Sequence, residues 1–162
     1  MDIVVANSHT HNIGVLLGHG NGSFAHQVIY STGDRSYPHH LAIGDFNNDN
    51  QIDIVVVNYG RSVISVLGPL INERFVIGIL LNVGNGTFAH PVMYATGYNS
   101  LPRSVAVRDF NNDHRSDILV VNSGTNNVGI FLGYGNGSFE EQRTYSTGVD
   151  FQLTSVTVQD FN

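Results

Sequence analysis

Two nine-residue segments of the chain carry oxygen-bearing side chains at positions 1, 3, 5 and 9. They read Asp-Phe-Asn-Asn-Asp-Asn-Gln-Ile-Asp at 45–53 and Asp-Phe-Asn-Asn-Asp-His-Arg-Ser-Asp at 109–117. A tight loop with this spacing can surround one ion with hard ligands, and position 7 can add its backbone carbonyl, which together suit Ca²⁺. The candidate ligands are Asp45, Asn47, Asp49, Gln51 and Asp53 in the first loop, and Asp109, Asn111, Asp113, Arg115 and Asp117 in the second.

A polar turn whose Asn and Asp side chains only cap backbone amides is the alternative reading of one such segment. Repetition at the same phase favours metal binding, because Asp160 and Asn162 repeat the beginning of the motif and Asp2 repeats its end. Crowded carboxylates repel each other unless a cation lies between them. Mg²⁺ suits the loops less well, since it prefers a stricter octahedron, and the Glu at position 12 and the helices of an EF-hand are missing.

Position 6 of the motif distinguishes the two loops. A sharp turn commonly has Gly at this position, where the first loop has Asn50 and the second has His114. Asn adopts left-handed backbone geometry more readily than His. We therefore expect the first loop to bind the metal more tightly.

The loops belong to a tandem repeat. A strand-like Asp-Ile-x-Val-x-Asn motif begins at residues 2, 53 and 117, and Gly-Asn-Gly-Ser/Thr-Phe begins at 20, 84 and 135, so both motifs recur with spacings of 51 and 64 residues. A 51-residue unit therefore carries a 13-residue insertion in its middle copy. The insertion is expected at about 59–76, because 64–67 and 77–80 repeat one strand pattern.

Each unit contains four short strand patterns separated by turns, and no segment shows sustained helical periodicity. In the last complete unit these patterns cover 104–109, 117–122, 127–132 and 138–145. Asn136 and Gly137 precede the fourth pattern and suit a type I′ hairpin turn, which needs positive φ at both central residues. Four antiparallel strands in about 50 residues are typical of a β-propeller blade, so the fold class is all-β.

The blade count is partial. The chain contains strands two to four of a first blade at 2–31, two complete blades at 39–97 and 103–148, and the first strand of a further blade at 153–160. Three blade equivalents are fewer than the usual four to eight, which indicates a fragment of a longer propeller. Alternatively, the last strand supplies the missing first strand of the opening blade, or two chains complete each other by self-association.

These motifs carry a family resemblance. The sequence Asp-Phe-Asn-Asn-Asp-x-x-x-Asp-Ile, followed by Val-Gly and by Gly-Asn-Gly-Ser/Thr-Phe, resembles FG-GAP or VCBS repeats and is similar to those in the propeller of integrin α subunits. The resemblance covers the chain except the insertion. It implies a propeller with structural Ca²⁺ at the loop positions named above, used extracellularly for adhesion or for recognition of a protein or glycan ligand.

Composition and motifs exclude several other functions. Seven basic residues against thirteen acidic residues give a net charge of −6, which provides no basic face for nucleic acid. No apolar run approaches the ~20 residues that span a bilayer, so no membrane insertion is expected. The pairs His9 with His11 and His39 with His40 are interpreted as structural or solvated residues. No Gly-x-Ser-x-Gly nucleophile motif is present, so we expect no catalysis.

Two alternatives to a binding module remain open at the level of sequence. The chain could be an accessory or catalytic propeller of a polysaccharide-acting enzyme, although the separated Glu73, Glu140 and Glu141 give little sign of an acid/base pair. The insertion and the truncated repeats would also fit a non-functional gene fragment.

Overall fold

The computed structural model describes residues 1–62, 74–149 and 151–160, and within these ranges the one helical element is a turn of 3-10 helix, η1 (Ser8–Thr10). The described strands form four sheets; we call the three larger ones blades a, b and c, and the fourth is a two-stranded hairpin. Blade a contains β1 (Ile3–Asn7), β2 (Asn12–Leu16) and β3 (Val28–Ser31). Blade b contains β4 (Pro38–Gly44), β5 (Asp53–Ser62), β6 (Arg74–Leu80) and β9 (Val92–Gly97), with a hairpin of β7 (Asn82–Gly84) and β8 (Thr87–Phe88) between the last two. Blade c contains β10 (Pro102–Arg108), β11 (Asp117–Asn122), β12 (Asn127–Phe131) and β13 (Arg143–Ser146).

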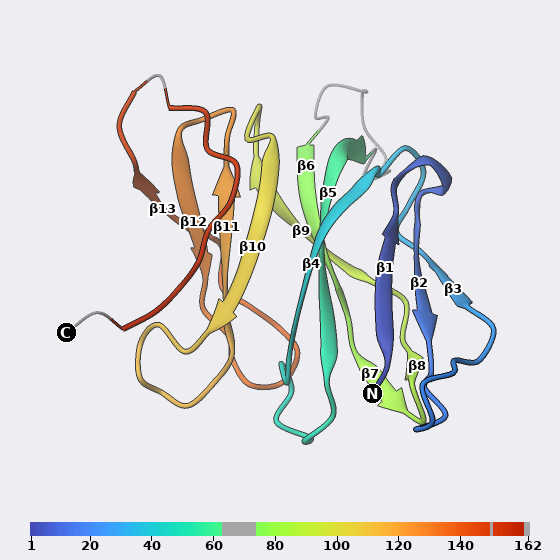
Figure 1. Ribbon diagram of the computed structural model, residues 1–162. Coiled ribbons are helices and arrows are strands. Elements are labelled where there is room, and N and C mark those ends of the chain that lie inside the picture. The colour runs from blue at the N-terminus through green and yellow to red at the C-terminus, as the bar shows by residue number, and fades with distance from the viewer. Residues whose placement is uncertain (63–73, 150, 161–162) are drawn as a thin grey trace, which may run out of the picture.

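The strands of each blade pair with their neighbours in chain order, and every pair is antiparallel. Figure 1 shows the three sheets side by side, with blade b between blades a and c. The first strands of blades b and c, β4 and β10, lie against each other. The prediction of an all-β fold built from four-stranded propeller blades is confirmed.

The second strand of blade b explains why the blades stack. β5 contains the continuous apolar run Ile-Val-Val-Val at 54–57, and all four side chains are buried. Since successive strand residues point to opposite faces, Ile54 and Val56 join the core shared with blade a, while Val55 and Val57 join the core shared with blade c. Both faces of blade b are therefore covered by a neighbouring blade.

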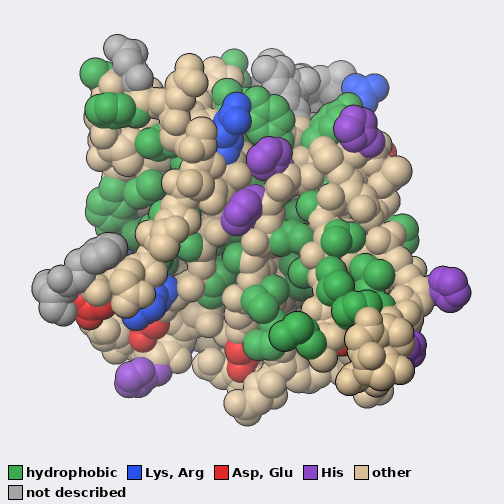
Figure 2. Space-filling view, viewed as in Figure 1, with side chains coloured by type: hydrophobic (Ala, Val, Ile, Leu, Met, Phe, Trp, Pro, Cys, Tyr) green, Lys and Arg blue, Asp and Glu red, His purple; other side chains and the backbone are tan. Residues whose placement is uncertain are grey.

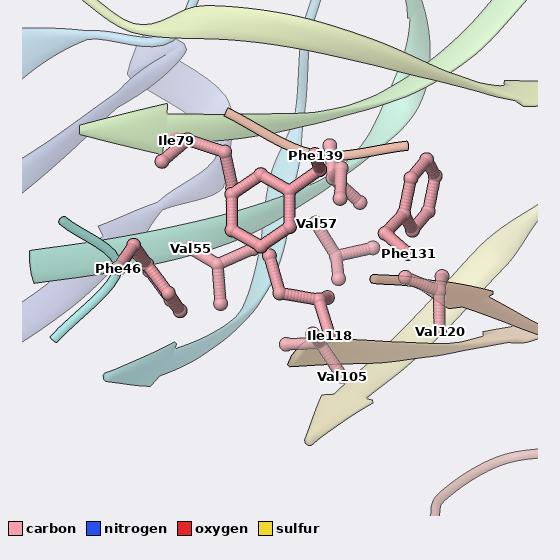
Figure 3. Packing of buried hydrophobic residues seen from close by; sticks show 10 residues of the cluster. Phe46, Val55, Val57, Ile79, Val105, Ile118, Val120, Phe131 and Phe139 are labelled. Carbon is pink, nitrogen blue, oxygen red and sulfur yellow. The ribbon is translucent and has the colours of Figure 1, made fainter. Parts of the chain in front are cut away.

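The core between blades b and c includes a residue of the first candidate loop. Phe46, position 2 of that loop, is buried and packs edge-to-face on Phe139 with ring centroids 5.5 Å apart. Figure 3 shows Phe46 among the aliphatic side chains of both blades, which include Val55 and Ile118. Full burial of a Phe side chain contributes roughly 1.5–3 kcal/mol, so this contact ties the loop to the core.

Most of the expected insertion, residues 63–73, lies outside the described residues. On either side of it, β5 continues to Ser62 and β6 begins at Arg74. β6 pairs with β5 through Val56 opposite Gly78, as β12 pairs with β11 through Val120 opposite Gly129. The segment at 77–80 thus lies in the place of a regular third strand.

A buried asparagine marks the irregularity of the middle blade. In blade c, the Asn122 amide donates to Asn127 Oδ1 across the strand pair at 2.9 Å. In blade b, the equivalent pair is Asn58 opposite Val76, and the side chain of Asn58 is fully buried, with neither polar atom hydrogen-bonded to any residue that the structure describes. The chain around the insertion has therefore replaced the partner of Asn58 with an aliphatic residue.

Two local predictions are wrong. Residues 153–160 were expected to form a strand, but residues 151–160 have no strand assignment, because a ladder needs a neighbouring strand and none of the described residues supplies one. The Asn136–Gly137 turn is not type I′, since only Gly137 has positive φ. The Asn136 side chain instead accepts from the backbone N–H and the hydroxyl of Ser138, at 3.0 and 2.6 Å.

Candidate metal-binding loops

The two predicted loops occupy equivalent places at one end of the molecule. The first joins β4 to β5 and the second joins β10 to β11, both at the bottom of Figure 1. Acidic side chains gather at this end in Figure 2. Because the antiparallel strands on both sides are fixed in their blades, the loop ends are held in a defined geometry.

In the first loop the oxygen-bearing side chains turn onto the backbone of the loop. The Asp45 carboxylate accepts from the backbone N–H groups of Asp49 at 3.2 Å and Asn50 at 2.8 Å. Asn47 Oδ1 also accepts from the Asp49 N–H at 3.2 Å, and Asp49 Oδ1 accepts from the Gln51 N–H at 2.8 Å. The side chains of positions 1, 3 and 5 are thereby drawn together on a compact loop.

The second loop repeats this arrangement. Asp109 accepts from the N–H groups of Asp113 at 3.2 Å and His114 at 2.7 Å, and Asp113 accepts from the Arg115 N–H at 2.9 Å. The Asn111 amide donates to Asp113 Oδ2 at 3.0 Å, as the position-3 amide does in the first loop at 2.9 Å. Partial desolvation would raise the pKa of Asp109, but hydrogen bonds from the backbone N–H groups of residues 111–114 outweigh it and lower the pKa.

Both loops use left-handed backbone geometry at two positions. At position 6, Asn50 has φ 63° and His114 has φ 64°, so the expected left-handed residue is present in each loop. Position 4, which the sequence analysis did not single out, is also left-handed, with φ 58° at Asn48 and 60° at Asn112. Three of these four residues are Asn, which tolerates this region, and His114 is the exception.

The aspartates at position 9 are structural acceptors. Asp53 is fully buried, and its two oxygens accept from the backbone N–H groups of Phe46 and Asn82, both at 2.8 Å. Asp117 is buried in the same way and joins its own loop to Gly133. Each of these carboxylates fastens one end of the loop to the chain that leaves the third strand.

Among the described residues, no base forms an ion pair with the carboxylates of the first loop. Burial raises the pKa of Asp53 above its ordinary value, the two backbone hydrogen bonds oppose that rise, and the negative charges of Asp49 and Asp45 add to it. Three carboxylates are therefore close enough to repel one another. A bound cation would relieve this repulsion.

The position-7 side chains point to their own loop carboxylates. The Gln51 amide donates to Asp49 Oδ2 at 3.3 Å, and the Arg115 guanidinium lies 3.8 Å from Asp113 Oδ2. An arginine side chain donates only, so position 7 of the second loop can offer a metal its backbone carbonyl alone. In the part of the chain that the structure describes, no group of three His, Asp or Glu side chains is arranged to hold a metal, so Asn47, Asn111 and backbone carbonyls would have to complete each site.

Sequence reasoning missed a buried hydroxyl pair at each blade junction. Thr32 and Ser36 join their hydroxyls at 2.7 Å between blades a and b, and Thr96 and Ser100 do so at 2.8 Å between blades b and c. All four residues are buried. The sequence feature that could have predicted these pairs is the motif Thr-Gly-x-x-Ser-x-Pro, which is repeated at 32–38 and 96–102.

One of the histidines connects two blades. His40 on β4 accepts the backbone N–H of Val105 on β10 through Nδ1 at 3.4 Å. Burial lowers the pKa of His40, and the charge of the adjacent His39 lowers it further. His39 is exposed. His40 therefore has a structural place in the fold.

Comparison with known proteins bears on the repeat. A family model described as an FG-GAP-like repeat matches residues 1–56 and 109–162, which include both candidate loops. No curated protein matches the chain in sequence. The matched ranges cover more than half of the chain and leave out the part of blade b that holds the insertion.

Proposed function

The chain belongs to the FG-GAP-like repeat family, and from that premise we propose that it is a Ca²⁺-stabilised propeller module that recognises a protein or glycan ligand outside the cell. Its three sheets are propeller-type repeat units. None of the helices in the described part of the chain is long and apolar enough to cross a membrane. The proposed role is binding, without catalysis.

The observation that carries the calcium proposal is the near-identity of the two loops. Positions 1, 3 and 5 hold oxygen side chains that the same backbone N–H groups fix in both blades. Asp45, Asn47 and Asp49, and their counterparts Asp109, Asn111 and Asp113, would provide the ligands. A bound Ca²⁺ would supply positive charge that offsets the repulsion among these carboxylates and rigidifies the loop.

A surface cluster at the other end of blade b supports the recognition role. β5 starts at the first loop and carries Tyr59 near its far end, where the Arg103 guanidinium lies 5.5 Å from the centre of the Tyr59 ring and the His39 ring lies 6.2 Å from it. Arg103 Nε also donates to Ser123 Oγ at 3.2 Å. Tyr59 is exposed and Arg103 is partly exposed, and aromatic and cationic side chains held in place in this way suit contacts with sugars and with protein ligands.

Thermal unfolding with and without a chelator tests the metal. We expect the melting temperature to fall when Ca²⁺ is removed and to recover when it is returned, with Mg²⁺ giving less recovery. The double variant Asp49→Ala with Asp113→Ala should show no response. An unchanged melting temperature, with no Ca²⁺ by elemental analysis, would reject the proposal.

Binding to a glycan array, with hydrolysis and elimination products assayed on the same ligands, tests the recognition role. We expect retention of a ligand without product formation, and loss of retention in Tyr59→Ala with Arg103→Ala. Tyr98→Ala is the matched control, since Tyr98 is exposed and no contact of its ring with Arg103 or His39 is found. Product formation would contradict the binding role in favour of catalysis.

A further inference from the structure

Aromatic side chains gather at the end of blade b that lies away from the two acidic loops, the upper end in Figure 1. The ring of Tyr37 packs edge-to-face on the ring of His11, with the centroids 4.5 Å apart. The ring of Tyr59 lies beside that of His39, and the Arg103 guanidinium lies over it. These five residues, which we call the upper cluster, come from all three blades.

Backbone contacts hold the two tyrosines of the upper cluster in place. The Tyr37 carbonyl accepts the Tyr59 N–H at 3.1 Å, and the Tyr37 N–H donates to His11 Nδ1 at 3.4 Å. A side chain at Gly60 would collide with the Tyr37 ring, so the glycine lets this ring lie against the backbone of β5. Tyr37 is 43% exposed and Tyr59 is 37% exposed. Both rings are therefore fixed and accessible to a ligand.

Blade c repeats this backbone arrangement without the aromatic residues. Leu101 and Ser123 take the places of Tyr37 and Tyr59, and the Ser123 N–H donates to the Leu101 carbonyl at 3.2 Å. The left-handed geometry is also the same, with φ 45° at Leu101 and 46° at Tyr37. The turn thus forms without aromatic side chains, so folding does not account for the two tyrosines. Tyrosine and arginine are among the residue types enriched where proteins contact their ligands.

Arg103 brings an unneutralised charge to the upper cluster. Its Nε donates to Ser123 Oγ at 3.2 Å, which orients the guanidinium. Among the ion pairs of the described residues, none joins Arg103 to a carboxylate. A guanidinium held in this way can bind a carboxylate of a ligand through two parallel N–H···O bonds.

The surroundings of Arg103 favour an anion as its partner. The segments at 33–40 and 98–103 contain one acidic residue, Asp34, against Arg35, Arg103 and two histidines. Figure 2 shows Arg and His side chains near this end of the molecule. Each acidic loop, with three aspartates, lies at the opposite end. The charges of the chain therefore direct an anionic ligand to the upper cluster.

We propose that the upper cluster binds an acidic glycan, a chain whose sugars carry carboxylates as uronic and sialic acids do. Arg103 binds a sugar carboxylate, and the tyrosine rings pack on the C–H groups of the sugar rings, with their hydroxyls as partners for sugar hydroxyls.

A sugar fits the upper cluster better than a peptide main chain does. The backbone groups beside the rings are already paired, Tyr59 N–H with the Tyr37 carbonyl and Gly60 N–H with the Ser36 carbonyl at 2.7 Å. The ligand therefore meets rings, hydroxyls and a guanidinium, and few free backbone groups. This inference rests on the recognition role proposed above and narrows its ligand, and it does not depend on calcium.

A glycan array tests the ligand class when each glycan that contains uronate or sialate is printed beside its carboxyl-reduced form. We expect retention of an acidic glycan and about tenfold weaker retention of its reduced form, because the reduced form lacks the partner of Arg103. Polyglutamate on the same array tests an acidic peptide. Equal retention of both forms, or retention of polyglutamate alone, would overturn the inference and leave the broader recognition role standing. No retention of any printed ligand would overturn the inference together with glycan recognition.

Four variants test the residues on the glycan that is retained. Arg103→Gln should weaken retention about tenfold. Tyr59→Ser and Tyr37→Leu introduce the residues that blade c has in the same arrangement, so they should weaken retention with an unchanged melting temperature. Arg35→Gln is the matched control, since it removes an exposed charge from the same end outside the upper cluster and should leave retention unchanged. Equal losses in Arg35→Gln and Arg103→Gln would show attraction by net charge alone and would overturn the proposal.

Discussion

The loops at 45–53 and 109–117 share a backbone hydrogen-bond frame and differ at positions 6, 7 and 8, of which positions 6 and 7 bear on charge. The first loop has Asn50 and Gln51, and the second has His114 and Arg115. In the second loop, protein groups that carry or can carry positive charge lie beside the carboxylates, with Arg115 Nη1 3.8 Å from Asp113 and His114 Nδ1 4.0 Å from Asp109.

This difference in charge means that the two loops depend to different degrees on a bound cation. The second loop contains part of its own counter-charge, so its shape depends less on an external cation. The first loop has amides where the second has bases, and the negative charges of Asp45 and Asp49 act on Asp53, with no ion pair to a base found for them among the described residues. We therefore infer that the first loop contributes more of the calcium dependence, while the backbone frame gives both loops the same fold.

The largest expected loss of stability comes from the position-9 aspartates, which the two loops have in common. Asp53→Ala and Asp117→Ala should each lower the free energy of unfolding by about 2–5 kcal/mol, because each leaves one buried and one partly buried N–H group without an acceptor. Asp2→Ala is the matched control. Asp2 is exposed, and among the described residues the one N–H bonded to it is that of Gly18 at 2.8 Å, so its loss should cost about 1 kcal/mol or less.

Urea denaturation at saturating chelator measures these three variants without a metal contribution. If Asp53→Ala cost no more than Asp2→Ala, the position-9 carboxylates would not be the fastening points of the loops.

The next effect tests the difference between the loops. Asp49→Ala should remove more than half of the rise in unfolding free energy that Ca²⁺ produces, and Asp113→Ala should remove the smaller part. Each site contributes about 2.7 kcal/mol when free Ca²⁺ is a hundredfold above the dissociation constant of that site, and the contributions of the two sites add. Chemical denaturation of both variants with and without Ca²⁺ gives the two shares. Equal shares would mean that Arg115 and His114 do not substitute for the cation.

A smaller effect is expected from an exchange at position 6. His114→Asn should stabilise the chain by about 0.5–1 kcal/mol, because Asn adopts the φ of 64° at lower cost. The reciprocal Asn50→His should destabilise by a similar amount. Both variants are compared by denaturation in chelator. A change of the same sign in both would show that backbone strain does not separate the loops.

The smallest expected effect is a pH dependence that comes from His40, which lies outside the loops. The pKa of His40 is lower in the folded chain than its ordinary value of 6.5, so the unfolded chain binds the proton more readily. The stability that neutral His40 contributes to the fold is therefore fully present above pH 6.5 and is lost as the pH falls from 6.5 through the lowered pKa. Melting temperature against pH should therefore decline below 6.5 in the native sequence. His40→Gln should flatten this decline, whereas His39→Gln, at an exposed position, should keep most of it.

The local part of each loop could be predicted from sequence, and the long-range part could not. The spacing of Asp45, Asn47 and Asp49 and the left-handed position 6 depend on neighbours within nine residues. The role of Asp53 depends on Asn82, 29 residues away, and the contact of Tyr94 with Phe139 spans 45 residues. Such contacts form only when blades stack, and the pattern within one repeat does not specify them.

Strand prediction failed for a related reason. Residues 153–160 have the alternation of a first strand, as 104–109 do, yet only the latter segment lies beside the second strand of its own blade in the described part of the chain. A segment forms a β-strand only when a neighbouring strand pairs with it, so the alternating pattern predicts only that the segment is able to pair.

Calcium titration by isothermal calorimetry of the native sequence, with Asp49→Ala and Asp113→Ala in parallel, tests the central claim most directly. The account predicts two sites of unequal affinity, loss of the tighter site in Asp49→Ala, and loss of the weaker site in Asp113→Ala. A folded chain that gives no calcium heat, or one whose binding is unchanged in both variants, would contradict it.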